Sequence, residues 1–139
     1  MSKPNILITG CAGFIGSHAV DYFLEKGYNV DGVDCFTYAG KVSNIKHQYE
    51  NPKFKLFNTN ICNTSEILEI CQLRDIHWII NFAAETHVDN SIKSCDAFIR
   101  SNIQGVKSLL EVCKKTGTKL FHVSTDEVYG DIREGSFTE

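Results

Sequence analysis

Residues 5–16 read NILITGCAGFIG, a strand-like apolar run that ends in three glycines, Gly10, Gly13 and Gly16. Three consecutive apolar residues are typical of a strand buried on both faces of a parallel sheet. The apolar pattern that follows predicts an amphipathic helix directly after the glycines. Gly10 allows a tight turn, Gly13 lets a pyrophosphate approach the backbone, and Gly16 lets helix and strand pack closely. The stretch therefore predicts a phosphate-binding turn, although glycines also punctuate ordinary loops.

An acidic residue ends the next predicted strand, which covers residues 29–34. Asp34 follows the last glycine by about 20 residues, the spacing at which a carboxylate binds the ribose of an adenine dinucleotide. The segment CFTYAG at residues 35–40 contains no Arg or Lys that could pair with a 2′-phosphate. The sequence therefore favours NAD over NADP as the cofactor. The alternative for Asp34 is a solvated side chain that only closes a strand.

The composition is that of one globular domain over residues 1–139, with 42% hydrophobic and 22% charged residues. A net charge of −3 argues against nucleic acid as a partner. No apolar run is long enough for a membrane span or a signal peptide, so we expect a cytoplasmic protein without a membrane partner. The six cysteines are scattered without a Cys-x-x-Cys pair, which predicts reduced thiols and no metal site.

Strands and helices alternate along the rest of the chain. Further strands are predicted at residues 54–57, 77–82 and 119–124, and further helices at residues 41–49, after Asn63, and at residues 96–116. Five strands joined by crossovers predict an α/β fold, a doubly wound parallel sheet with strand order 3-2-1-4-5.

Each of these helices has an apolar side. The first would turn Val42, Ile45 and Tyr49 toward the sheet, and the second opens on Asn63 and Glu66, which match a capping box. The apolar residues of the third form one stripe at helical spacing: Ile99, Ile103, Val106, Leu110 and Cys113.

Polar residues follow two of the predicted strands, at the sheet edge where a doubly wound fold binds its ligands. The fourth strand continues into AAETHVD at residues 83–89, and the fifth into STDEVYG at residues 124–130. Small Ala83 and Ala84 leave room for a cofactor to lie against the backbone. The charged residues after Ala84 also fit a solvated loop, and His87 has no partner at metal-ligand spacing.

These motifs resemble those of the extended short-chain dehydrogenases/reductases. Within that group the resemblance is closest to the dTDP-glucose or UDP-glucose 4,6-dehydratases, because Thr125, Asp126 and Glu127 match their Thr-Asp-Glu, whereas sugar epimerases lack the acid pair. The resemblance implies a Rossmann fold, NAD as cofactor and a nucleotide-sugar substrate. It also implies the following residues for NAD: Gly10, Gly13, Phe14, Ile15, Gly16, Asp34, Cys35, Phe36, Thr37, Asn60, Ile61, Phe82, Ala83, Ala84 and Ser101.

The chemistry implied by the resemblance needs two carboxyl groups. C4 of the glucose is oxidised by hydride transfer, water is eliminated across C5 and C6, and the hydride returns to C6. By the family pattern, Glu127 is the base, Asp126 is the acid, Thr125 hydrogen-bonds the sugar near O4, and Thr86 contacts the substrate. An alternative for this stretch is a capping box formed by Ser124 and Glu127, which requires no catalysis.

Two features depart from the family pattern. Asn60 stands where the family usually has Asp, which changes the hydrogen-bonding groups offered to adenine. The family's Tyr-x-x-x-Lys and its sugar-nucleotide domain would follow Glu139, so we expect an amino-terminal part that is inactive alone and belongs to a homodimer at full length. Alternative functions are a UDP-sugar epimerase or decarboxylase of the same superfamily, and a non-catalytic NAD-binding module.

Overall fold

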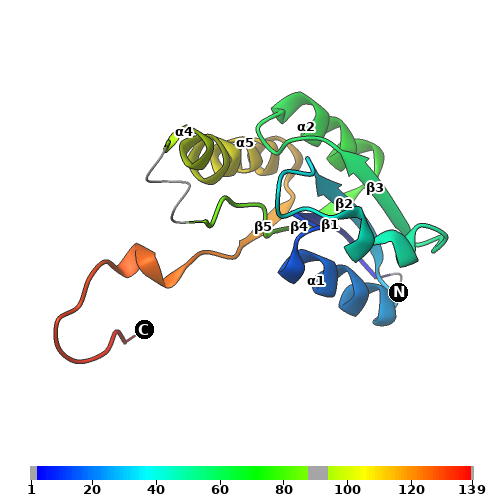
Figure 1. Ribbon diagram of the computed structural model, residues 1–139. Helices are drawn as coiled ribbons and strands as arrows, with labels where there is room; N and C mark the ends of the chain where they lie inside the picture. The colour runs from blue at the N-terminus through cyan, green and yellow to red at the C-terminus, as the bar shows by residue number, and fades with distance from the viewer. Residues whose placement is uncertain (1–2, 88–93, 139) are drawn as a thin grey trace.

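The computed structural model describes residues 3–87 and 94–138, and for Asp126 and Glu127 it describes the backbone alone. Its centre is a five-stranded parallel sheet with strand order β3-β2-β1-β4-β5 (Figure 1), which confirms the predicted doubly wound topology. The strands are β1 (Asn5–Thr9), β2 (Asn29–Asp34), β3 (Phe54–Asn58), β4 (Ile76–Asn81) and β5 (Lys119–His122).

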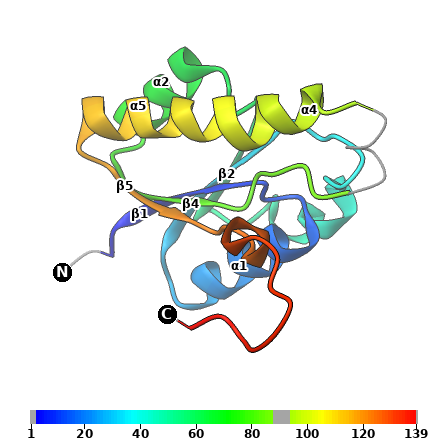
Figure 2. The same ribbon diagram turned by 90° about the vertical axis from the view of Figure 1, so that its left-hand side faces the viewer.

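Helices cover both faces of the sheet (Figure 2): α1 (Phe14–Glu25) on one face, and α2 (Thr64–Leu73) and α5 (Val106–Thr116) on the other. The apolar run of β1 serves both layers. Leu7 belongs to the core beside α2 and α5, whereas Ile6 and Ile8 belong to the core beside α1. All three are almost completely buried, and each contributes about 1.5–3 kcal/mol through burial.

Two local predictions are wrong in detail. Residues 41–49 form two short 3-10 turns, Val42–Asn44 and Lys46–Gln48, in place of one helix. Of the three apolar residues predicted to face the sheet, Ile45 is buried, whereas Val42 and Tyr49 are both 46% exposed. The capping box before α2 does not form either: Glu66 accepts a hydrogen bond from the hydroxyl of Thr59, which comes from the end of β3.

The long helical segment begins with α4 (Asp96–Phe98), continues as a π-helix over Ile99–Gly105 and ends in α5. The side of this segment that faces the sheet contains its buried residues, Gly105, Ser108, Leu109 and Val112. Most of the apolar stripe identified from the sequence does not face the sheet, since Ile99, Ile103 and Leu110 are 42%, 63% and 54% exposed, although Cys113 packs against the core.

Close packing explains the small residues on that side. A Cβ atom at Gly105 would overlap the side chain of Ile61, which follows β3. The helix therefore makes its closest approach to the segment after β3 at Gly105, while Leu109 and Val112 fill the core farther along it. Within the described residues, no helix combines the length and the apolar character needed to cross a bilayer.

Candidate functional site

The glycine turn after β1 is packed so tightly that side chains are excluded from it. Gly10 has a φ of 65°, and a Cβ atom there would lie 2.7 Å from the backbone nitrogen of Ala83. A Cβ atom at Gly16 would overlap the carbonyl oxygen of Gly10. Inside the turn, the N–H of Gly13 donates to the Gly10 carbonyl at 3.1 Å. These contacts bring the start of α1 against the ends of β1 and β4 and leave bare backbone facing the space above them.

Asp34 connects this turn to the loop after β2. Its Oδ2 accepts a hydrogen bond from the N–H of Ala12 at 2.9 Å, and its Oδ1 accepts one from the N–H of Phe36 at 2.8 Å. The side chain is nearly buried, at 8% exposed. Each carboxylate oxygen has a second lone pair, so Asp34 can still accept a hydrogen bond from a ribose hydroxyl.

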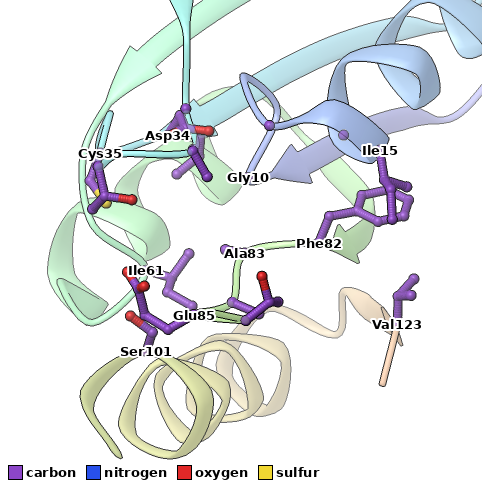
Figure 3. A pocket seen from close by; sticks show the side chains of 18 of the residues that line it. Gly10, Ile15, Asp34, Cys35, Ile61, Phe82, Ala83, Glu85, Ser101 and Val123 are labelled. Atoms are coloured by element: carbon purple, nitrogen blue, oxygen red, sulfur yellow. The ribbon is translucent and has the colours of Figure 1, made fainter. Parts of the chain in front are cut away.

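A cavity of about 390 Å³ lies along the carboxyl ends of all five strands. In Figure 3, Asp34 and Cys35 lie at one end and Ile15, Phe82 and Val123 at the other. Sixteen of the residues assigned to cofactor or substrate from the sequence line it: Gly10, Gly13, Phe14, Ile15, Gly16, Asp34, Cys35, Thr37, Asn60, Ile61, Phe82, Ala83, Ala84, Thr86, Ser101 and Thr125. Cavities of this size hold small-molecule ligands.

Three assigned residues are not among the lining side chains. Phe36 packs against the core beside α1 and faces the site only through its N–H bond to Asp34. The side chains of Asp126 and Glu127 lie outside the described residues, so their assignments stay predictions. Their backbone forms the start of a 3-10 turn, Asp126–Tyr129, directly after the cavity-lining Thr125.

The cavity also has lining residues that we did not assign to it from the sequence: Val33, Ala39, Gly40, Thr59, Glu85, Val123 and Ser124. Val33, Thr59, Glu85 and Ser124 each adjoin an assigned residue near a strand end, so the strand boundaries were the signal that could have found them. Gly40 also meets a local constraint, because a Cβ atom there would lie 2.6 Å from Oδ1 of Asp34.

A polar ladder joins three strands directly beneath the cavity. The hydroxyl of Thr9 donates to Oδ1 of Asn81, and Nδ2 of Asn81 lies 2.9 Å from Nδ1 of His122. The three residues are paired across β1, β4 and β5, and Thr9 and Asn81 are buried. This ladder fixes the relative positions of the strand ends from which the cavity wall begins.

The side chain of Asn60 is held locally. Its Oδ1 accepts a hydrogen bond from the N–H of Cys62 at 2.9 Å, and its Nδ2 donates to Sγ of Cys35 at 3.6 Å. Partial burial, and then the negative charge of Asp34, raise the pKa of the Cys35 thiol. Among the described residues, no group of three His, Cys, Asp or Glu side chains is placed to hold a metal ion.

The model of the GDP-mannose 4,6 dehydratase family matches residues 7–139. The chain belongs to this family. A curated relative, dTDP-glucose 4,6-dehydratase of Haemophilus influenzae, is 37% identical in an alignment 148 residues long, gaps included, which covers 97% of this chain and 44% of that protein. The chain thus spans less than half the length of this relative.

Two solved structures also match nearly all of this chain and less than half of their own length. The dTDP-glucose 4,6-dehydratase of Bacillus anthracis in complex with NAD matches with a TM-score of 0.85 and 39% identity, over 99% of this chain and 43% of that one. The UDP-glucose 4-epimerase of Thermotoga maritima, solved with UDP-glucose, matches with a TM-score of 0.83 and 34% identity, over 94% of this chain and 41% of that one. Dehydratases and epimerases therefore share the fold of this chain.

Proposed function

We propose that this chain forms the NAD-binding part of a 4,6-dehydratase that acts on dTDP-glucose or UDP-glucose. The observation that carries the proposal is the continuous cavity along the strand ends, which joins the glycine turn and Asp34 to Thr125 after β5. Such a cavity at the switch point of a doubly wound sheet is where dinucleotides bind. Among the relatives, the Bacillus anthracis dehydratase was solved with NAD.

The residues present fit NAD. The turn at Gly10 and Gly16 has no room for side chains, so a pyrophosphate could approach the backbone N–H groups in the first turn of α1, which have no acceptor within the helix. Asp34 would accept hydrogen bonds from the adenosine ribose, and Ala83 and Ala84 leave space for the nicotinamide end. Bound NAD would take a hydride from C4 of the sugar and return it to C6.

Elimination of water requires one group to remove the C5 proton and another to protonate the departing C6 hydroxyl. We assign the first role to Glu127 and the second to Asp126. Thr125 would hydrogen-bond the sugar near O4, and Thr86 would also contact the substrate. Support comes from the placement of Thr86 and Thr125 in one cavity and from the family membership of the chain.

Cofactor binding is tested with the chain itself, by titration with NAD and with NADP. Tighter binding of NAD is the expected result, because Asp34 would repel a 2′-phosphate. Tighter binding of NADP would contradict the role of Asp34, and failure to bind either dinucleotide would overturn the proposal.

Catalysis is tested in the complete protein that the gene encodes. Glu127→Gln should lower the rate of dehydration by about 10²–10⁴-fold, the usual contribution of a general base. The matched control is Glu134→Gln, which changes an exposed glutamate a short distance along the same segment. Unchanged turnover in Glu127→Gln would contradict the role of Glu127 as the base, and absence of dehydration in the native complete protein would favour a non-catalytic NAD-binding module.

A UDP-sugar epimerase or decarboxylase is the second candidate, because the Thermotoga maritima epimerase has nearly the same fold over this region. The products separate these reactions. Loss of the C6 oxygen with C6 itself retained identifies a dehydratase, retention of both identifies an epimerase, and release of C6 as CO₂ identifies a decarboxylase.

We further propose a homodimer for the full-length protein, supported by the exposed apolar side chains of Ile99, Ile103 and Leu110. We place the protein in the cytoplasm on the strength of its cysteines, which are all free thiols. Sedimentation of the complete protein, and of its Ile103→Lys variant, tests the dimer.

A further inference from the structure

One side chain holds both backbone groups of a residue in the cavity wall. The N–H of Glu85 donates to Oδ1 of Asn102 at 2.8 Å, and Nδ2 of Asn102 donates to the carbonyl oxygen of Glu85 at 2.9 Å. Asn102 lies on the π-helical segment Ile99–Gly105, 17 residues after Glu85 in the sequence. The Asn102 amide thus pairs with Glu85 as a neighbouring strand would.

This contact lies where the support of the sheet ends. The N–H of Phe82 still donates to the carbonyl of Thr9 at 3.1 Å, as the last bond between the β4 segment and β1. Among the described residues, the N–H groups of Ala83 and Ala84 have no hydrogen-bond partner. Glu85 is the next residue along the wall whose backbone is held. The wall from Phe82 to Thr86 is therefore fixed at the sheet by Thr9 and at its far end by Asn102.

The π-helix places this amide next to the cavity. Ser101, directly before Asn102, lines the same cavity, and Gly105 packs against Ile61 with no room for a side chain. The position of the helix is thereby set by Ile61, which also lines the cavity. Single π-helical turns within α-helices occur frequently at functional sites.

We infer that Asn102 is a positioning residue, which presets the cavity wall at residues 82–86 for the bound dinucleotide by pairing with both backbone groups of Glu85. The inference rests on the proposed function, because NAD is the ligand that this wall would contact. Its physical basis is general: the wall is ordered before the ligand binds, so less conformational entropy is lost on binding.

Three variants of the chain test the inference. Asn102→Ala removes both hydrogen bonds. Asn102→Asp keeps an acceptor for the N–H of Glu85 but places a carboxylate against its carbonyl oxygen. Gln104→Ala is the matched control, since Gln104 is another exposed amide on the same π-helical turn. Alanine favours helix more than asparagine does, so Asn102→Ala should fold, which circular dichroism and thermal melting check.

The first measurement is hydrogen exchange of the Glu85 amide. Asn102→Ala should exchange about tenfold faster than the native chain, whereas Asn102→Asp and Gln104→Ala should stay near the native rate. The second measurement is NAD affinity, which should fall by about tenfold in Asn102→Ala, fall in Asn102→Asp as well, and stay unchanged in Gln104→Ala. Unequal effects of Asn102→Asp on exchange and affinity would separate the two hydrogen bonds.

The outcomes distinguish this inference from the proposed function. If the native chain binds NAD and Asn102→Ala binds it equally well, the inference is wrong and the proposed function stands. If affinity falls while exchange at Glu85 is unchanged, Asn102 does not act through Glu85 and the inference is also wrong. If the native chain does not bind NAD, the proposed function fails, and the role in presetting the wall is decided by the exchange of Glu85 alone.

Discussion

The Asp34 end of the cavity and the wall at residues 82–86 are built by different means. At the Asp34 end, the shape is set by close backbone packing of Gly10 against Gly16 and by the nearly buried carboxylate of Asp34, which accepts hydrogen bonds from the N–H groups of Ala12 and Phe36. In the wall, Glu85 is held by the exposed side chain of Asn102 on the π-helical segment. Buried contacts make the first part rigid by construction, whereas the second part depends on one exposed side chain.

The largest effect should come from breaking the Asp34 end at its tightest contact. In Gly16→Ala the new Cβ would overlap the carbonyl oxygen of Gly10, so helix α1 or the turn must shift. We expect NAD binding to fall by at least about 100-fold and the free energy of unfolding to drop by about 1–3 kcal/mol. Calorimetric titration and urea unfolding measure the two quantities.

Gly13→Ala is the control for that experiment. A Cβ atom at Gly13 would lie 3.3 Å from the Gly10 carbonyl oxygen, a contact that a small adjustment relieves. Stability near the native value with weakened NAD binding is expected, because the methyl group would lie in the path of the pyrophosphate. Equal destabilisation by both variants would show that the turn is not set by its closest contact.

The next effect concerns the carboxylate that links the glycine turn to the loop after β2. Asp34→Asn replaces one acceptor oxygen by an NH₂ group that faces a backbone N–H, from Ala12 or from Phe36. An unsatisfied buried donor costs about 1–3 kcal/mol, and the preference for NAD over NADP should shrink. Unfolding and paired titrations check this, with exposed Asp131→Asn as control. An unchanged cofactor preference would remove Asp34 from ribose recognition.

A buried aspartate earlier in β2 should affect the stability of the chain without affecting NAD binding. Asp31 is 1% exposed and accepts a hydrogen bond from Nε of Arg74 at 2.9 Å. Burial raises the pKa of Asp31, and Arg74 opposes that rise. The folded chain therefore holds the proton more tightly than the unfolded chain does. The resulting stability is greatest below the unfolded pKa of about 3.9 and is lost as the pH rises through the folded pKa.

Urea unfolding of the native chain and of Asp31→Asn across this acidic range tests that sign. As the pH rises, the unfolding free energy of the native chain should fall relative to that of Asp31→Asn. NAD affinity at neutral pH should be the same in both. A change in NAD affinity would mean that the site extends well beyond the carboxyl ends of the strands.

The same contrast between buried and exposed contacts explains what the sequence could predict. The strand order and the glycine turn were predictable because buried apolar runs and Gly10, Gly13 and Gly16 report constraints on their own neighbourhood. The pairing of Asn102 with Glu85 was not, because an exposed asparagine belongs to no periodic pattern.

The apolar periodicity of residues 96–116 did not indicate which side of that helix packs against the sheet. Ile99, Ile103 and Leu110 form a regular stripe, yet the sheet packs against the side of the helix that contains Gly105 and Ser108. An apolar pattern shows which residues can be buried but not which surface the sheet approaches, and here the close contact with Ile61 decides.

The smallest expected effect is chemical and lies at the Asp34 end. A raised pKa leaves less of the Cys35 thiol as reactive thiolate at about pH 8, so alkylation by iodoacetamide should be slow. We expect Cys35 to react a few-fold more slowly than exposed Cys95, as measured by mass spectrometry of peptides. Asp34→Asn should accelerate the reaction at Cys35, because it removes a nearby negative charge, and should leave Cys95 unaffected. If Cys35 reacts at the same rate in both chains, the charge of Asp34 does not reach the thiol, and the two residues do not act as one unit at this end of the cavity.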